Sequence, residues 1–284
     1  MVVPERLAAA CRDITERTVW LGRLPQTVRE LRARWSLTLD APFDSDEVSC
    51  AWVARAVRRD GTRAILKLGM PHMEGAHELE GLRFWDGDPT VRLLEADDDL
   101  NAMLLESCEP GTSLRDEPEP EQDTIIAGLL RRLWRQPSSP HRFRPLSSML
   151  ASWSDEAISA SGQWNDVGLA QAGLVLFSEL SAPGRDDVLL ATDLHAGNVL
   201  RAQRERWLVI DPKPFVGDRA YDATQHLLNC RQRLLNAPHD TISRFADLLD
   251  VNAGRLRLWM FARAAAEPRD VWDEESIAVA RALA

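Results

Sequence analysis

Hydrophobic and polar positions follow two different periods along the chain, first strand-like and then helical. After two leading helices, expected over 4–17 and from Pro25 onward, the spacing of apolar residues changes to the alternation typical of strands. The strands are predicted over 36–39, 48–58, 62–68, 91–94 and 102–106, with a helix over 73–85 between the third and the fourth.

Beyond Pro110-Gly111 the pattern is almost entirely helical, apart from short apolar runs between residues 188 and 210. Helices are predicted from about 121 to 136, over 149–164, 168–181, 223–235, 241–249 and 254–266, and over 274–283. A sheet near the N-terminus followed by helices indicates an α+β protein.

Composition excludes some partners. The 284 residues carry 34 Lys and Arg against 44 Asp and Glu, a formal net charge of −10, which argues against nucleic acid as the main partner. An acidic chain is compatible with a cationic substrate. The four cysteines are scattered and form no C-x-x-C pair, so neither a zinc site nor a disulfide framework is indicated.

The chain shows no segment that suggests export or membrane insertion. Its first seventeen residues interrupt a short apolar run with charges, unlike a signal peptide, and no apolar run approaches membrane-spanning length. We therefore expect a cytoplasmic protein without a membrane partner.

The stretch from Leu189 to Asp222 carries the candidate chemistry. Asp193 is followed five positions later by Asn198, and two short apolar runs then lead to Asp211, which stands before a proline. Those runs read as the strands of a hairpin, which would bring Asp211 back towards the other two residues. Carboxylate and amide oxygens suit Mg²⁺, so a magnesium site is predicted, although D-x-x-x-x-N alone is common by chance.

Three motifs in this stretch resemble those of a known family. They are D-L-H-A-G-N at 193–198, W-L-V-I-D-P-K at 207–213 and G-D-R-A-Y-D at 217–222. The chain is similar to the aminoglycoside phosphotransferase family, and most closely to its streptomycin 6-phosphotransferase and hydroxyurea-kinase branch. One departure is Ala191-Thr192, where the family usually has His-Gly before the catalytic aspartate.

The resemblance implies a bilobal, protein-kinase-like fold and roles for the three polar residues. A small β-rich N-terminal lobe over 1–108 would bind nucleotide, and a larger, mainly helical lobe over 109–284 would carry the catalytic loop and the acceptor site. Asp193 would face the acceptor hydroxyl, while Asn198 and Asp211 would hold Mg²⁺ against the phosphates of ATP.

Nucleotide contacts are implied for four residues of the first lobe. Lys67 lies in the apolar strand A-I-L-K-L, where a lysine is ordinarily solvent-facing, but it resembles the kinase lysine that contacts the α- and β-phosphates. The family pattern selects Glu78, rather than Glu80, as its partner. Ser107 and Cys108 stand where the connector between the lobes would read the adenine edge through backbone groups.

The expected function is transfer of the γ-phosphoryl group of ATP to a hydroxyl of a small cationic acceptor such as streptomycin. A kinase for another small metabolite shares every residue named above. A nucleotide-binding pseudokinase is a further alternative, because the histidine is missing and the segment expected to cover the phosphates has Ser45 and Ser49 but no glycine. Carboxylates near the last helix, including Asp270 and Asp273, could grip an amino sugar or simply start that helix. The sequence predicts no oligomeric state.

Overall fold

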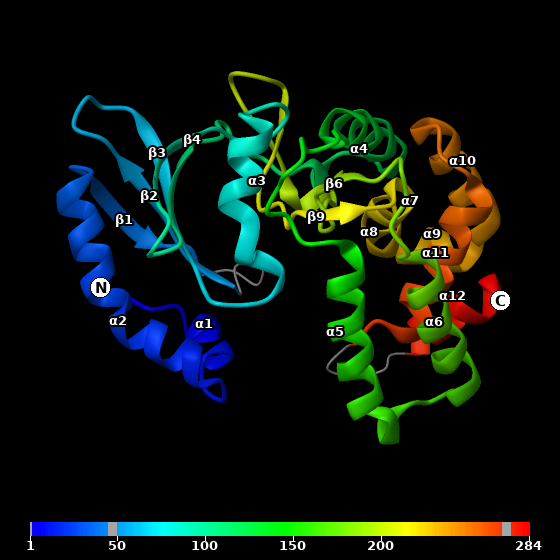
Figure 1. The fold of residues 1–284 in the computed structure, drawn as a ribbon. Helices are drawn as coiled ribbons and strands as arrows, with labels where there is room; N and C mark the ends of the chain where they lie inside the picture. Colours follow the sequence, from blue (N-terminus) through cyan, green and yellow to red (C-terminus); the bar gives the residue numbers. More distant parts are fainter. Residues whose placement is uncertain (1, 45–49, 269–273) are drawn as a thin grey trace. The chain divides into compact units, whose positions relative to one another are not determined.

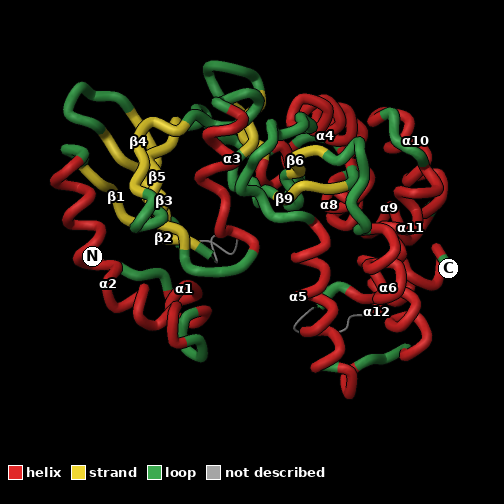
Figure 2. The backbone as a smooth tube through the Cα atoms, in the orientation of Figure 1, coloured by secondary structure: helices red, strands yellow, loops and turns green. Residues whose placement is uncertain are grey.

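The computed structural model describes residues 2–44, 50–268 and 274–284, and these form two compact units (Figure 1). Unit 1 consists of Met1–Ser113 and Val199–Pro212, and unit 2 consists of Leu114–Asn198 and Lys213–Ala284. Figure 2 shows that the sheet belongs to the first of them and that the second is dominated by helices. The α+β class predicted from the sequence is confirmed.

Unit 1 is built on a five-stranded antiparallel sheet of order β1-β2-β3-β5-β4. Its strands are β1 (Thr38–Pro42), β2 (Ala51–Val57), β3 (Arg63–Gly69), β4 (Leu93–Asp97) and β5 (Ala102–Glu106). Its helices are α1 (Glu5–Ala10), α2 (Thr15–Arg34), the 3₁₀ turn η1 (Glu74–His77) and α3 (Glu78–Trp85).

Helices cover both faces of this sheet, so alternate residues of β3 enter different cores (Figure 1). Leu66 and Leu68 pack with residues of α1 and α2, whereas Ile65 packs with Leu79 and Leu82 of α3. Lys67 has the parity of Ile65 and therefore points to the face that α3 covers. A lysine in a strand covered on both sides is buried, which fits the expected pairing with Glu78 rather than a solvent-facing side chain.

The sequence predicts a helix that begins at Pro25. In the structure Pro25 instead lies inside α2. The prediction was wrong because the buried stripe of Leu24, Val28 and Leu31 continues across the proline. Proline has a helical φ and gives up one backbone hydrogen bond, which the packing of this stripe offsets.

The predicted hairpin is present, as β7 (Val199–Arg201) pairs with β8 (Trp207–Val209), with Val199 opposite Val209. It joins unit 1 because the backbone of Val209 exchanges hydrogen bonds with Pro89 and Val91, 3.1 and 3.0 Å long. Arg204 lies in the turn between β7 and β8, and its guanidinium contacts the carboxylate of Glu106 at 3.0 Å. The hairpin thereby carries Asp211, two residues after β8, into the same unit as β3.

Unit 2 packs its helices around α11 and two short strands. Its strands are β6 (Val188–Leu190) and β9 (Phe215–Gly217), and its 3₁₀ turns are η2 (Leu114–Asp116), η3 (Ser161–Gln163) and η4 (Ala196–Asn198). The helices are α4 (Glu119–Leu133), α5 (Leu146–Ser159), α6 (Val167–Leu180), α7 (Arg219–Asp222), α8 (Thr224–Asn229), α9 (Arg231–Asn236), α10 (Pro238–Leu249), α11 (Ala253–Ala266) and α12 (Glu274–Leu283).

Helices α6 and α11 approach closely at Gly173. A Cβ atom there would lie 2.8 Å from Cβ of Ala266 and 3.1 Å from the carbonyl oxygen of Ala262. Small residues on both helices therefore set this contact and place α11 in the interior of unit 2. Within the described ranges, no helix combines the length and the apolar character needed to cross a membrane.

Candidate active site

Lys67 is the centre of a buried ionic group in unit 1. Only 7% of the residue is exposed, and its ammonium lies 2.6 Å from a carboxylate oxygen of Glu78 and 2.6 Å from one of Asp211. Glu78 begins α3, the helix that covers this face of the sheet. The predicted pairing of Lys67 with Glu78 is therefore present, while Glu80 lies 3.7 Å from His77.

Opposing effects determine the charge of Lys67. Burial lowers the pKa of its ammonium, but Asp211 and Glu78 raise it further, so the pKa stands above the usual lysine value. Lys67 is therefore a permanent cation at neutral pH. Such an ammonium, fixed by two partners, can hold phosphate oxygens without a further change of conformation.

Asp211 reaches Lys67 from a left-handed turn. Its φ is +53°, a conformation that aspartate tolerates better than most residues, and Pro212 follows it. Its side chain remains 37% exposed. The turn at the end of the hairpin thus joins residues 144 positions apart in the chain.

The loop that carries Asp193 begins directly after β6 in unit 2, and Ala191 and Thr192 stand where the family usually has His-Gly. Thr192 has a φ of +48°, and its hydroxyl donates to the carbonyl oxygen of Lys213 at 2.6 Å. Asp222 accepts the backbone N–H groups of Ala191 and Thr192 at 3.1 and 2.7 Å, and the indole N–H of Trp134 at 2.9 Å. A β-branched residue in this conformation is strained, and these bonds hold it in place.

Asp222 is fully buried, and burial raises its pKa to about 6 against the lowering effect of its three hydrogen-bond donors. Asp222 is the last residue of α7, and α8 begins at Thr224 with Ala223 as its N-cap, so Asp222 does not begin the helix predicted after it. Its carboxylate ties α7 to the backbone that precedes Asp193.

Asp193 is half-buried and contacts two side chains of unit 2. One carboxylate oxygen accepts the amide N–H of Gln225 at 2.7 Å, and the other is bound by the ammonium of Lys213. Lys213 comes two residues after Asp211, and its backbone N–H donates to Ala191 at 2.8 Å. Lys213 is therefore directed at the candidate catalytic aspartate rather than at solvent.

Asn198 offers an amide oxygen that could coordinate a metal ion. Its amide nitrogen donates to the backbone carbonyl of Asp193 at 2.9 Å, so its amide oxygen is left to accept or to coordinate. Asp211 offers carboxylate oxygen from a partly exposed side chain. Amide and carboxylate oxygens fit a hard cation such as Mg²⁺. Asn198 belongs to unit 2 and Asp211 to unit 1.

Ser107 and Cys108 follow β5 directly, in the connector at the edge of unit 1. The Cys108 thiol packs beside the core that α3 covers, and burial raises its pKa to about 12. It is an unreactive thiol at neutral pH. A role for this connector in reading adenine stays a prediction.

Four other candidate residues, Ser45, Ser49, Asp270 and Asp273, lie outside the described residues. Two acids that continue the last group, Glu274 and Glu275, stand in the first turn of α12, as expected of acids at a helix start.

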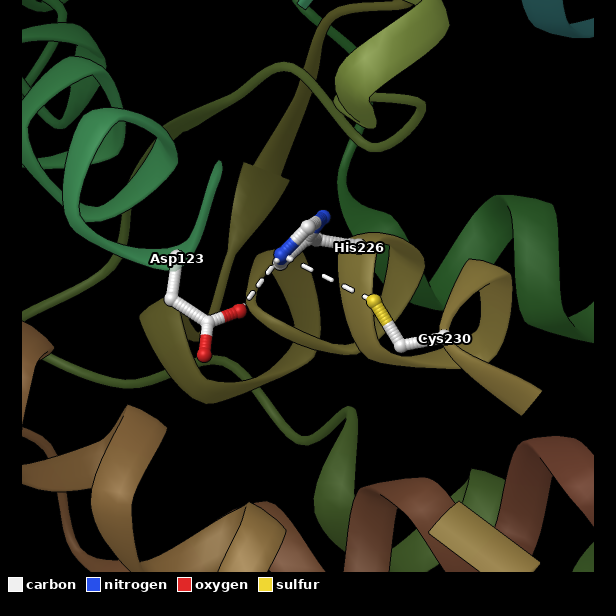
Figure 3. A group of neighbouring side chains, drawn as sticks. All are labelled: Asp123, His226 and Cys230. Atoms are coloured by element: carbon white, nitrogen blue, oxygen red, sulfur yellow. Dashed lines mark hydrogen bonds and ion pairs between the residues drawn. The ribbon is translucent and has the colours of Figure 1, made fainter. Parts of the chain in front are cut away.

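One further cluster has the composition of a metal site, and it is made of Asp123, His226 and Cys230 (Figure 3). The His226 Nε2 atom lies 2.8 Å from Asp123 and 3.9 Å from Cys230. However, the Arg233 guanidinium binds both carboxylate oxygens of Asp123, at 2.5 and 2.8 Å. Burial also raises the pKa of the Cys230 thiol to about 11, so thiolate is scarce. These contacts tie α4 to α8 and α9 without a metal ion.

Comparison with known proteins identifies the family. The model of the aminoglycoside/hydroxyurea antibiotic resistance kinases matches residues 34–275. The chain belongs to this family. A streptomycin 6-kinase of Streptomyces griseus is 37% identical over 95% of this chain and 92% of its own length. Another, from Streptomyces glaucescens, is 39% identical over 78% of this chain and 72% of its own.

A solved structure, the choline kinase LicA of Streptococcus pneumoniae, shares the fold with a TM-score of 0.61 at 12% identity, covering 91% of this chain and 96% of that one. The protein is thus a phosphotransferase of the protein-kinase-like fold, as the three motifs predicted.

Sequence reasoning missed the residues behind Asp193, namely Gln225 on α8 and Arg263 on α11. Gln225 gives no local signal, because a polar residue on a helix is ordinarily a surface residue. Arg263 did give a sequence signal, since it is the single charge in the apolar run Trp259–Ala266. An arginine in such a run is seldom buried unless it is paired, so the run could have indicated a buried partner.

Proposed function

We propose that this kinase transfers the γ-phosphoryl group of ATP to a hydroxyl of a small cationic acceptor, with streptomycin as the first candidate. The observation that carries the proposal is the 37% identity to a streptomycin 6-kinase along 95% of the chain. The net charge of −10 is compatible with a cationic acceptor. An enzyme that uses ATP also fits the cytoplasmic location expected from the sequence.

We assign nucleotide binding to the N-terminal part, expected over 1–108, together with the hairpin that bears Asp211. Lys67, held by Glu78, grips the α- and β-phosphates, and the backbone at Ser107 and Cys108 contacts the adenine. Asn198 and Asp211 are the proposed ligands of Mg²⁺, which would neutralise charge on the phosphates. The amide and carboxylate oxygens of these two residues are of the kind that this hard cation prefers.

Acceptor binding and catalysis fall to the C-terminal part, expected over 109–284. Asp193 accepts a hydrogen bond from the acceptor hydroxyl and aligns it with the phosphoryl group. Phosphoryl transfer passes through a loose transition state, so alignment and charge neutralisation supply most of the acceleration, and a strong base is unnecessary.

The test is an acceptor screen with the purified protein, Mg²⁺ and ATP. Streptomycin, hydroxyurea and choline are offered separately, and both ADP release and the phosphorylated product are measured. Phosphorylated streptomycin supports the proposal. Product formed only from another acceptor would show that streptomycin is not the substrate and would identify that acceptor instead. Nucleotide binding without turnover on any acceptor would instead identify a pseudokinase.

A further inference from the structure

The carboxylate of Asp193 is held on both oxygens by side chains that come from different elements. The Gln225 Nε2 atom, on α8, donates to Oδ1 at 2.7 Å. Lys213, from the segment before β9, binds Oδ2. A carboxylate with one donor on each oxygen cannot rotate freely, so the lone pairs left for an incoming hydroxyl have a set direction.

Gln225 presents its nitrogen to Asp193 for a physical reason. Its amide oxygen accepts a hydrogen bond from the Arg263 guanidinium at 2.6 Å. Arginine has five N–H donors and no acceptor, so only the oxygen of the amide can face it. The nitrogen must then face Asp193, where it acts as a donor.

Arg263 is itself immobilised on α11. Only 2% of the residue is exposed, and its guanidinium bonds to Glu267 at 2.8 Å and to the hydroxyl of Thr224 at 2.7 Å. It also stacks over the ring of Tyr221, 5.1 Å from the centroid. Although burial lowers the pKa of Arg263, Glu267 and Tyr221 raise it above the ordinary value, so the charge is permanent.

We infer that Gln225 is a positioning residue for Asp193, and that Arg263 acts through Gln225 by fixing which way its amide faces. This inference rests on the proposed function, in which Asp193 meets the acceptor hydroxyl. A row of hydrogen bonds then runs from Glu267, at the C-terminal end of α11, through Arg263 and Gln225 to the carboxylate of Asp193.

The decisive variant is Gln225→Glu, which keeps the shape of the side chain. It gives buried Arg263 a second acidic partner but replaces the donor facing Asp193 with an acceptor. The new carboxylate also faces Oδ1 of Asp193 and repels it, so its effect is compared with that of Gln225→Leu, which adds no charge. If Gln225 positions Asp193, kcat for phosphorylation of streptomycin falls about tenfold or more, because a hydrogen bond to a charged group is lost.

Two further measurements separate positioning from damage to the fold. The KM for ATP of both Gln225 variants is expected to stay near that of the wild type, and the thermal midpoint is measured for each to detect damage to the fold. Gln225→Leu, which removes the donor without adding charge, should lower kcat less than Gln225→Glu. The matched control is Gln232→Leu on α9, where an exposed glutamine bonds only to Asn236, and its kcat should be unchanged.

A double-mutant cycle tests whether Arg263 acts through Gln225. The kcat losses of Arg263→Met and Gln225→Leu should fall well short of additive in the double variant, since both remove the same oriented donor. Should Arg263→Met fail to fold, Arg263→Lys replaces it in the cycle, and the Gln225 variants still test whether Gln225 positions Asp193.

The outcomes for this inference and for the proposed function are distinct. If Asp193→Asn abolishes transfer while Gln225→Glu retains wild-type kcat, the positioning role is wrong and the proposed function stands. If Asp193→Asn retains full transfer, the assignment of Asp193 fails and the inference fails with it. A loss of kcat in both, with an unchanged KM for ATP, supports the positioning role.

Discussion

The two units each hold a buried charged group, and the two groups are built in opposite ways. In unit 1 one ammonium, Lys67, lies between the carboxylates of Glu78 and Asp211. In unit 2 one carboxylate, Asp193, lies between the ammonium of Lys213 and the amide of Gln225. The first group places a cation and the second places an anion.

The charge balance of the two groups also differs. In unit 1 two carboxylates contact the single ammonium of Lys67, and Asp211 remains partly exposed. In unit 2 the acids Asp193 and Glu267 are bound by Lys213 and Arg263. In the proposed function the first group helps to hold the nucleotide, whereas the second orients the side chain of Asp193.

The largest expected effect is the loss of turnover in Asp193→Asn. The amide keeps the shape of the carboxylate but is a poorer acceptor for the hydroxyl, so kcat should fall by about a thousandfold. Isothermal titration should show that binding of Mg²⁺-ATP changes little, because Asp193 is assigned no contact with the nucleotide or with Mg²⁺. A large loss of nucleotide affinity would contradict that assignment.

The next effect compares the two lysines through stability. Lys67→Met leaves Glu78 buried without a cation and should lower the free energy of unfolding by about 3 kcal/mol. Lys213→Met should cost about 1 kcal/mol, because Asp193 keeps its bond to Gln225 and its side chain is 26% exposed. Urea denaturation of both variants measures the difference. Equal losses would show that the two groups are not distinct in their energetics.

A smaller effect is expected in the support of the catalytic loop. Asp222→Asn keeps the size of the side chain. Its NH₂ group, however, would face one of the N–H groups that now donate to the Asp222 carboxylate. We expect a loss of about 2 kcal/mol at pH 7, measured by urea denaturation. Asp166→Asn, at the more exposed N-cap of α6, is a control outside the loop and should cost less.

The smallest effect is the pH dependence of that loss. Because the pKa of Asp222 is raised to about 6 in the folded state, the folded protein binds more protons than the unfolded chain between about pH 4 and pH 6. The contribution of Asp222 is thus fully present at low pH and declines as pH rises through 6. The stability advantage of the wild type over Asp222→Asn should shrink from pH 4.5 to pH 7. An advantage that grows with pH would mean that hydrogen bonding outweighs burial.

Local patterns were sufficient for the fold class and for part of the candidate site. Alternation located the strands that carry Lys67, and the apolar runs on either side of a charged turn located the hairpin before Asp211. Local rules failed at Pro25, where packing of the α2 stripe overrides the tendency of proline to begin a helix. Alternation also left a solvent-facing Lys67 open, since it cannot tell whether a helix covers the second face of a sheet; only the family motif favoured the pairing with Glu78 that the structure shows.

The sequence by itself determined that this is an α+β kinase of a recognisable family, because strand and helix periods and the motif around Asp193 are local properties of the chain. Only the tertiary structure decided that Gln225 and Lys213 bind the carboxylate of Asp193 and that Arg263 binds Gln225. Their contacts join segments 20 to 38 positions apart in the sequence, and such contacts leave no periodic trace in it. Whether a polar side chain is a surface residue or a buried partner depends on what packs against it, and that is known only once the chain has folded.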